Sequence, residues 1–163
     1  VEVLTSFIAM IHRNSDEVSF VDEYLIEKGY TVDDDNRCQY LMGDDGIVDQ
    51  ALWAQLQAFL RNDTKHLLMV EYDDIVDQPD ETMRRIYDFL EVDYYQHDFN
   101  NVANTHRESE KQWNLKDMHH VRKEVKRISK RPEDVLSSRI LNKYKKLEYW
   151  KYPDSPYLKN GIR

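Results

Sequence analysis

The sequence predicts an α/β fold in which a parallel β-sheet is flanked by helices, formed as a single domain over residues 1–163. Two short apolar runs, residues 7–11 and 66–71, have the composition of strands that are covered on both faces. Helical patterns separate the two runs, and strands separated by helices pair in parallel. Two strands do not make a stable sheet alone, so further strands are expected from loop regions, another chain or residues that precede Val1.

Helical patterns follow each run along the chain. The first helix is expected to begin at Asn14 or Ser15, either of which can cap it, and to stop at Gly29. Apolar residues recur at helical spacing between residues 47 and 61, which predicts a second helix. A third helix is expected to start at Pro79, because proline is tolerated in the first turn of a helix.

The remaining segments are less regular in pattern. Residues 30–46 contain two acidic clusters and are predicted to be a mobile loop, whereas residues 91–117 are polar, with Trp113 and Leu115 as anchors. A basic helix is expected over residues 121–128, and a last helix starts at Pro132. The C-terminal part is therefore predicted to be helical.

Charge is distributed unevenly along the chain. Residues 1–118 carry 10 Lys and Arg against 26 Asp and Glu, whereas residues 119–163 carry 13 against 5. The basic segment, which we define as residues 119–131 (HHVRKEVKRISKR), is the densest in cations. One local cluster suits a small anionic ligand, while nucleic acid requires a broad basic face, so no nucleic-acid partner is expected. The alternative is a solvated helix face that balances the acids of its own chain.

Several classes of protein are excluded by what the sequence lacks. Its apolar runs are far shorter than the roughly 18 to 20 residues that span a membrane, and no signal-peptide pattern opens it. The single cysteine, Cys38, excludes an internal disulfide and a cysteine-built zinc site. We therefore expect a cytoplasmic protein without a membrane span.

Familiar catalytic and metal-binding motifs are also missing. The acidic clusters lack the spacing of a calcium loop, and the sequence has no nucleophile elbow or Walker A loop. The adjacent His119 and His120 would point to different faces of a helix, which does not suit a zinc site. No metal is expected, and the catalytic residues are unknown.

Two residues stand where the predicted strands end. Arg13 follows one strand at the start of a helix, where a guanidinium and free backbone N–H groups together suit a phosphate. Tyr72 follows the other strand and offers a ring face for a base or a hydroxyl for a phosphate. Ligands of parallel sheets bind at this edge, so a binding site is one interpretation of the two residues. The alternative, which the residues alone favour, is a surface Arg–Asp pair and a tyrosine packed on a strand edge.

Three segments, in this order, resemble the sulfotransferase family, whose enzymes use 3′-phosphoadenosine 5′-phosphosulfate. FIAMIHRNSDEV is similar to the family's strand that ends in Arg-Asn/Asp-Pro before a helix. VEYDDIVDQPDETMRRIYDFLEV is similar to its segment of strand, Tyr-Glu-Asp-Leu turn, proline and helix. MHHVRKEVKRISKRPEDVLSSRILNKYKKLEYW resembles the tail of several sulfotransferase-like proteins. The resemblance extends over about residues 7–152.

The resemblance implies a P-loop-NTPase-like sulfotransferase fold that is incomplete at the N-terminus. It implies transfer of a sulfuryl group from 3′-phosphoadenosine 5′-phosphosulfate to a hydroxyl or amine of a small-molecule or carbohydrate acceptor, without a metal. A homo-oligomer is left open. The residues implied to bind the nucleotide are Arg13 and Ser19 at the 3′-phosphate, Tyr72 at the adenosine, and Arg122, Lys123 and Arg131 closing over it.

The sequence also departs from the family pattern. The family's 5′-phosphosulfate loop and its catalytic histidine have no match here, and His119 or His120 is a weak substitute for that base. Val21 stands at the family's second 3′-phosphate ligand, so Ser19 serves only if the helix start is shortened. Glu91 replaces a glycine. An alternative is therefore a non-catalytic, sulfotransferase-like domain whose basic C-terminal segment binds a partner or an anionic ligand.

Overall fold

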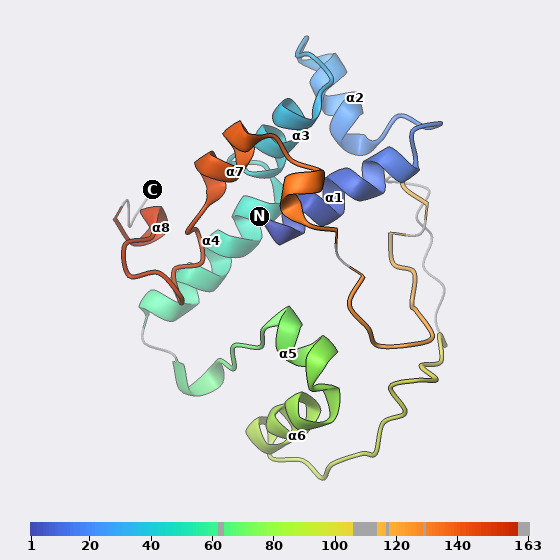
Figure 1. Ribbon diagram of the computed structural model, residues 1–163. Coiled ribbons are helices and arrows are strands. Elements are labelled where there is room, and N and C mark those ends of the chain that lie inside the picture. The colour runs from blue at the N-terminus through green and yellow to red at the C-terminus, as the bar shows by residue number, and fades with distance from the viewer. Residues whose placement is uncertain (62–63, 106–113, 117, 129, 160–163) are drawn as a thin grey trace.

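The computed structural model describes residues 1–61, 64–105, 114–116, 118–128 and 130–159, and every regular element in these ranges is helical (Figure 1). No β-strand forms in this part of the chain, so the predicted α/β fold with a parallel sheet is wrong. The elements are, in order, α1 (Glu2–Arg13), α2 (Phe20–Glu27), α3 (Asp34–Leu41), α4 (Ile47–Leu60), η1 (Thr64–His66), α5 (Tyr72–Asp77), α6 (Pro79–Leu90), η3 (Pro132–Asp134), α7 (Ser138–Tyr144) and α8 (Pro156–Lys159).

The first predicted strand lies inside α1. Leu4, Ile8 and Ile11 are all at least 97% buried and recur at the spacing of one helix face. The five-residue apolar run is therefore the middle of a longer helical stripe that starts before it. Short apolar runs fit a buried helix as well as a buried strand, which is the ambiguity that misled the prediction.

The second predicted strand is an irregular connection between η1 and α5. Its apolar side chains are not covered on both faces, since Leu67 and Met69 are both exposed. Residues 67–71 have no ladder partner among the residues that the structure describes. A buried strand requires both covered faces and a neighbouring strand to pair with. The segment is therefore not a strand, and it runs directly into α5.

Capping side chains decide where α2 and α3 begin. Ser19 accepts a hydrogen bond from the backbone N–H of Asp22 (3.1 Å), so α2 starts later than predicted. Asp33 accepts one from the N–H of Asn36 (2.8 Å) and starts α3 within the segment predicted to be a loop. Gly29 ends the α2 region with a φ of +72°, as expected for a helix stop.

The helices α4 and α6 form where the sequence predicts them. Pro79 occupies the first turn of α6, as expected. The helix ends at Leu90, after which Glu91 adopts a left-handed conformation with a φ of 55°. This is the position where the family pattern has glycine, which adopts that conformation without strain.

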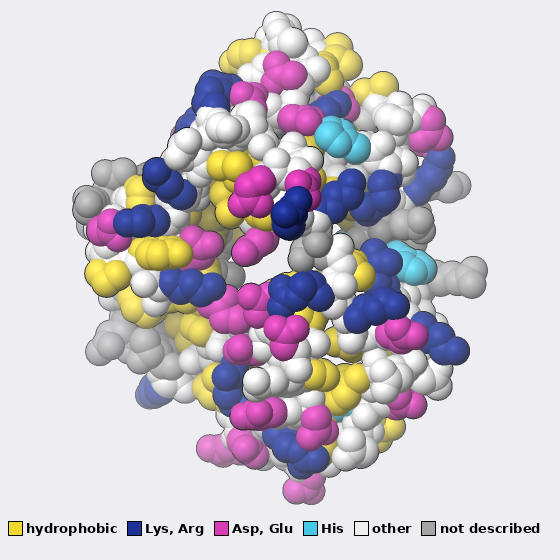
Figure 2. Space-filling view, in the orientation of Figure 1, with side chains coloured by type: hydrophobic (Ala, Val, Ile, Leu, Met, Phe, Trp, Pro, Cys, Tyr) yellow, Lys and Arg dark blue, Asp and Glu magenta, His cyan; other side chains and the backbone are white. Residues whose placement is uncertain are grey.

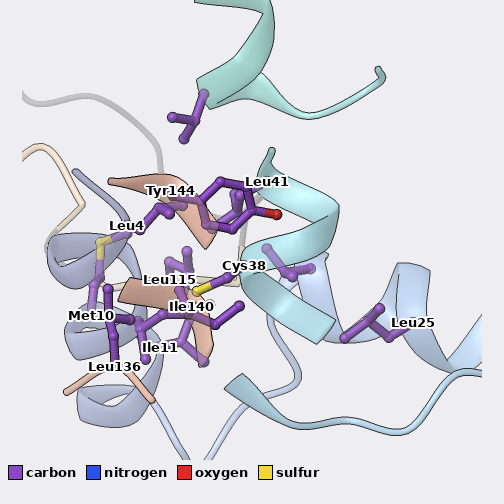
Figure 3. Close-up of a cluster of buried hydrophobic side chains, with 13 residues drawn as sticks. Leu4, Met10, Ile11, Leu25, Cys38, Leu41, Leu115, Leu136, Ile140 and Tyr144 are labelled. Atoms are coloured by element: carbon purple, nitrogen blue, oxygen red, sulfur yellow. The ribbon is translucent and has the colours of Figure 1, made fainter. Parts of the chain in front are cut away.

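The core lies between α1, α3 and α7, a helix of the C-terminal part (Figure 3). Cys38 and Leu41 from α3 are fully buried against Ile140 and Tyr144 of α7. Leu115 joins this core at 1% exposure, as predicted, whereas Trp113 lies outside the described residues. The C-terminal part of the chain therefore closes over the N-terminal helices.

The predicted basic helix over residues 121–128 does not form. Its backbone pairs instead with residues 99–102, through Val102 N–H to Lys123 O and Val125 N–H to Phe99 O, both at 2.8 Å. The helix predicted from Pro132 divides into η3 and α7, because Ser137 caps α7 by accepting from the N–H of Ile140.

Candidate functional site

Arg13 is the last residue of α1 and is exposed. The expectation that it stands at the start of a helix is wrong: the free backbone groups beside it are carbonyls, so it has no helical N–H groups to share with a phosphate. Its side chain forms no hydrogen bond or ion pair with any residue that the structure describes. The guanidinium is therefore available to an anion by itself.

A buried asparagine fixes the chain beside Arg13. The Asn14 Oδ1 accepts from the backbone N–H of Lys116 (2.8 Å), and its Nδ2 donates to the carbonyl of the same residue (3.3 Å). Lys116 also pairs with Asp16 (3.2 Å) and Glu17 (2.8 Å). These contacts hold the start of the basic segment, three residues further on, near the C-terminal end of α1.

The cations of the basic segment divide into two groups. Lys126, Arg127 and Arg131 form ion pairs with carboxylates. Arg122, Lys123 and Lys130 are exposed, and none of the three side chains forms an ion pair or a hydrogen bond with a described residue. Figure 2 shows Lys and Arg side chains gathered where the chain between α6 and η3 crosses this face. Arg122 and Lys123 are thus the cations of the predicted set, beside Arg13, that remain available to a ligand.

Arg131 is already engaged within the chain. It donates two hydrogen bonds to Asp134, both of 2.9 Å, and its side chain is 79% exposed. The hydrogen bond to Asp134 raises the pKa of Arg131 and lowers that of the carboxyl. A ligand phosphate would have to compete with this local pair.

Tyr72 is the first residue of α5, and 49% of it is exposed. The Arg127 guanidinium lies 6.0 Å from the centre of its ring and donates hydrogen bonds to Asp73 and to Asp77, the latter at 2.7 Å. One cation therefore contacts the ring of Tyr72 and two of the three carboxylates of α5, while the third, Asp74, pairs with Arg85. The sequence reasoning missed Arg127, although the spacing of Asp73 and Asp77 places both acids on one helix face.

The predicted adjacency of Arg13 and Tyr72 depended on the sheet and is not found. Figure 1 shows the C-terminal end of α1 and the start of α5 well apart. Ser19, the third predicted ligand, is 1% exposed and uses its hydroxyl to cap α2. The structure thus brings the basic segment toward Arg13 but leaves Tyr72 in a separate cluster with Arg127.

A second contact between distant segments joins α5 to the C-terminal part. Glu71, the residue before α5, accepts from the indole N–H of Trp150 (2.7 Å) and from Lys151 (2.9 Å). The hydrogen bond to Glu71 raises the pKa of Lys151. Two of the three segments that carried the resemblance are therefore in direct contact.

Nucleophilic and metal chemistry find little support in the described residues. Cys38 is fully buried, and burial raises the pKa of its thiol to about 12, so a thiolate nucleophile is excluded at neutral pH. Across the described ranges, no group of three or more His, Cys, Asp or Glu side chains is placed to hold a metal ion. No helix within those ranges is long and apolar enough to cross a membrane.

Comparison with known proteins gives one match. Residues 48–98 match the model of the Sulfotransferase family, a range that covers α4, α5 and α6 and includes Tyr72 and Pro79. Searches of curated proteins and of solved structures returned no match. The sequence resemblance to the sulfotransferase family is thereby confirmed for this part of the chain, residues 48–98.

Proposed function

We propose that this protein binds 3′-phosphoadenosine 5′-phosphosulfate and transfers its sulfuryl group to a hydroxyl or amine acceptor. The observation that carries the proposal is the match of residues 48–98 to the sulfotransferase family. In this reaction the acceptor oxygen or nitrogen forms a bond to sulfur while the bond from sulfur to the 5′-phosphate oxygen breaks. The acceptor loses a proton to a base, and 3′,5′-adenosine bisphosphate leaves.

Three exposed cations are the proposed phosphate ligands. Arg13, Arg122 and Lys123 pair with none of the described residues, so no ion pair within the described part of the chain must break before they bind an anion. The contacts of Asn14 with Lys116 support this grouping, because they hold the start of the basic segment near the end of α1. Hydrogen bonds from cations to phosphate are among the stronger ones in proteins.

Tyr72 is the proposed contact of the adenosine. Its half-exposed ring offers a stacking surface, and Arg127 beside it can take part in the same stack. Because Figure 1 shows α5 apart from the end of α1, a nucleotide that touches both would have to extend between the two parts. Arg131 would join only after it leaves Asp134.

Thermal unfolding with and without 3′,5′-adenosine bisphosphate tests the binding site. The nucleotide should raise the Tm of the wild type, since a ligand at about 100 times its Kd stabilises the folded state by about 2.7 kcal/mol. The shift should shrink in Arg13→Ala and in the double variant Arg122→Ala with Lys123→Ala. Arg61→Ala is the matched control, because Arg61 is an exposed cation outside the proposed site. A wild type without any shift contradicts the proposal, and an equal shift in Arg13→Ala contradicts the role of Arg13.

The exposed cations of the basic segment also favour a second candidate, a non-catalytic domain that binds an anionic ligand or partner. Both candidates predict binding of the bisphosphate, so binding does not separate them. A turnover assay separates the two candidates. It measures the release of 3′,5′-adenosine bisphosphate from 3′-phosphoadenosine 5′-phosphosulfate in the presence of a panel of hydroxyl and amine acceptors. Turnover that requires an acceptor supports the transferase, and tight binding without turnover supports the second candidate.

A further inference from the structure

The C-terminal end of α6 leaves large apolar side chains in solvent. Phe89, Leu90 and Val92 are 38%, 58% and 55% exposed. Thr82 is the only residue of α6 that is buried, so the apolar stripe of this helix remains partly uncovered by the described part of the chain. Neighbouring apolar side chains that stay exposed mark surfaces where another molecule binds.

Unpaired carboxylates surround these apolar side chains. Asp88, Glu91 and Asp93 are exposed, and none of the three forms an ion pair or a side-chain hydrogen bond with a described residue. Asp80, earlier in the same helix, is already held by an arginine at 2.7 Å. We define residues 88–93 as the acidic patch, which combines an apolar surface with uncompensated negative charge.

The basic segment presents a surface of the same kind and of opposite charge. Val121 and Ile128 are 41% and 48% exposed. The side chains of Arg122, Lys123 and Lys130, which lie close to them in the sequence, pair with none of the described residues. Apolar side chains with unpaired cations around them are the complement of the acidic patch.

The basic segment already binds carboxylates within its own chain. Arg127 donates hydrogen bonds to Asp73 and Asp77 of α5, the helix that precedes α6. No ion pair joins the acidic patch to the basic segment among the described residues. Figure 2 shows Asp and Glu side chains over α6, and Lys and Arg side chains beside them over the chain between α6 and η3. Both kinds of charge are therefore open to a partner on this face.

We propose that the acidic patch of one copy of this protein binds the basic segment of a second copy. Charge complementarity selects this occupant, because the chain itself carries both halves of the interface. In a two-fold arrangement each surface meets the other surface of the partner, so the contact is made twice and closes as a dimer. Arg122 and Lys123 are also proposed phosphate ligands, but association is measured without nucleotide and does not depend on the proposed function.

Sedimentation equilibrium of the wild type measures the association. A dimer should form with a Kd on the order of 10 µM, as for a small interface with many charges. Raising the NaCl concentration from about 0.05 M to about 0.5 M should weaken it at least about tenfold, because salt screens exposed charges. A protein that stays monomeric up to about 50 times that Kd overturns the proposal. Association that salt does not weaken overturns it as well.

Reversal of charge on each surface tests which residues meet. The double variant Glu91→Lys with Asp93→Lys reverses the acidic patch, and Arg122→Glu with Lys123→Glu reverses the basic segment. Each should be monomeric alone where the wild type dimerises, because like charges then face each other. An equimolar mixture of the two should dimerise again, since each reversed surface meets its complement. Asp45→Lys, at an exposed acid outside both surfaces, is the matched control and should dimerise like the wild type.

Each result decides the proposal. Two variants that are monomeric alone and dimeric when mixed support it. Dimers of either variant alone, or a mixture that stays monomeric although far-UV circular dichroism shows both variants folded, overturn it. If a reversal unfolds the protein, the neutral pair Glu91→Gln with Asp93→Asn takes its place and should weaken the wild-type association about tenfold. An unchanged Kd in that neutral pair overturns the proposal.

Discussion

The side-chain amide of Asn14 hydrogen-bonds both backbone groups of Lys116, which is 102 residues away in the sequence. Asn14 is 5% exposed, and its Nδ2 also donates to the carbonyl of Met10 at 3.0 Å. A single buried side chain thus caps the end of α1 and fixes the chain that leads into the basic segment. The arrangement of the proposed phosphate ligands depends on this contact.

Replacing Asn14 with alanine should reduce the free energy of unfolding by about 1–3 kcal/mol, because the partly buried N–H of Lys116 loses its acceptor. Urea denaturation of the two proteins measures the change. Asn142→Ala is the control, since Asn142 is exposed and its side chain makes only local hydrogen bonds, with Ser138 and Lys145, and it should change stability by about 0.5 kcal/mol or less. Equal stability of Asn14→Ala and the wild type would show that the contact contributes nothing.

Glu91→Gly should stabilise the protein by about 0.5–1 kcal/mol. Glu91 ends α6 with a φ of 55°, a conformation that costs free energy in every residue with a β-carbon. Thermal or urea unfolding measures the gain, and Glu91→Ala separates conformation from charge, because alanine removes the carboxylate and keeps the strain. A glycine variant no more stable than the alanine variant refutes the explanation.

Stability should fall in acid partly through Asp35. This carboxylate accepts from the Ser137 hydroxyl (2.6 Å) and from Arg139 (2.7 Å), contacts that lower its pKa below the usual 3.8 and connect α3 to the start of α7. A lowered pKa means that the stabilisation is complete above pH 3.8 and is lost as the pH falls toward the folded-state pKa. The Tm should therefore fall less steeply below pH 4 in Asp35→Asn than in the wild type. Parallel curves for the two proteins would contradict the assignment.

Trp150→Phe should lower the free energy of unfolding by about 1–2 kcal/mol beyond the matched change Trp53→Phe. Both substitutions reduce an indole to a phenyl ring, but only Trp150 donates to Glu71 (2.7 Å). Urea denaturation of both variants isolates that hydrogen bond. If the two substitutions cost the same, the contact between Trp150 and Glu71 does not stabilise the fold.

Several helices were predictable from local signals. Pro79 and the apolar stripe that follows it define α6, and Gly29 marks the end of the α2 region, since both residues act through their own backbone. Helix α3 was missed because acidic residues indicate a loop by composition, although Asp33 caps the helix by accepting from Asn36. The N-cap signal was present in the sequence, because Asp33 stands three residues before Asn36, and it was overlooked.

The predicted sheet was wrong. The predicted geometry of the site was therefore wrong too, because it placed Arg13 and Tyr72 at one edge of that sheet. The run at residues 7–11 fits a strand and a helix equally well, and only the buried Leu4 outside it reveals the helical stripe. The pairing of Arg127 with α5, and of Asn14 with Lys116, joins residues that are 50 or more positions apart. Local sequence patterns carry no information about such contacts, so the tertiary arrangement of the candidate site could not be derived from them.

The proposed function depends on recognition of the 3′-phosphate of an adenosine nucleotide. Isothermal titration with 3′,5′-adenosine bisphosphate and with adenosine 5′-phosphate measures this most directly, because the two ligands differ only in that phosphate. The bisphosphate should bind at least about tenfold more tightly, a difference of about 1.4 kcal/mol. Equal affinity for the two nucleotides, or no binding of the bisphosphate, would contradict it.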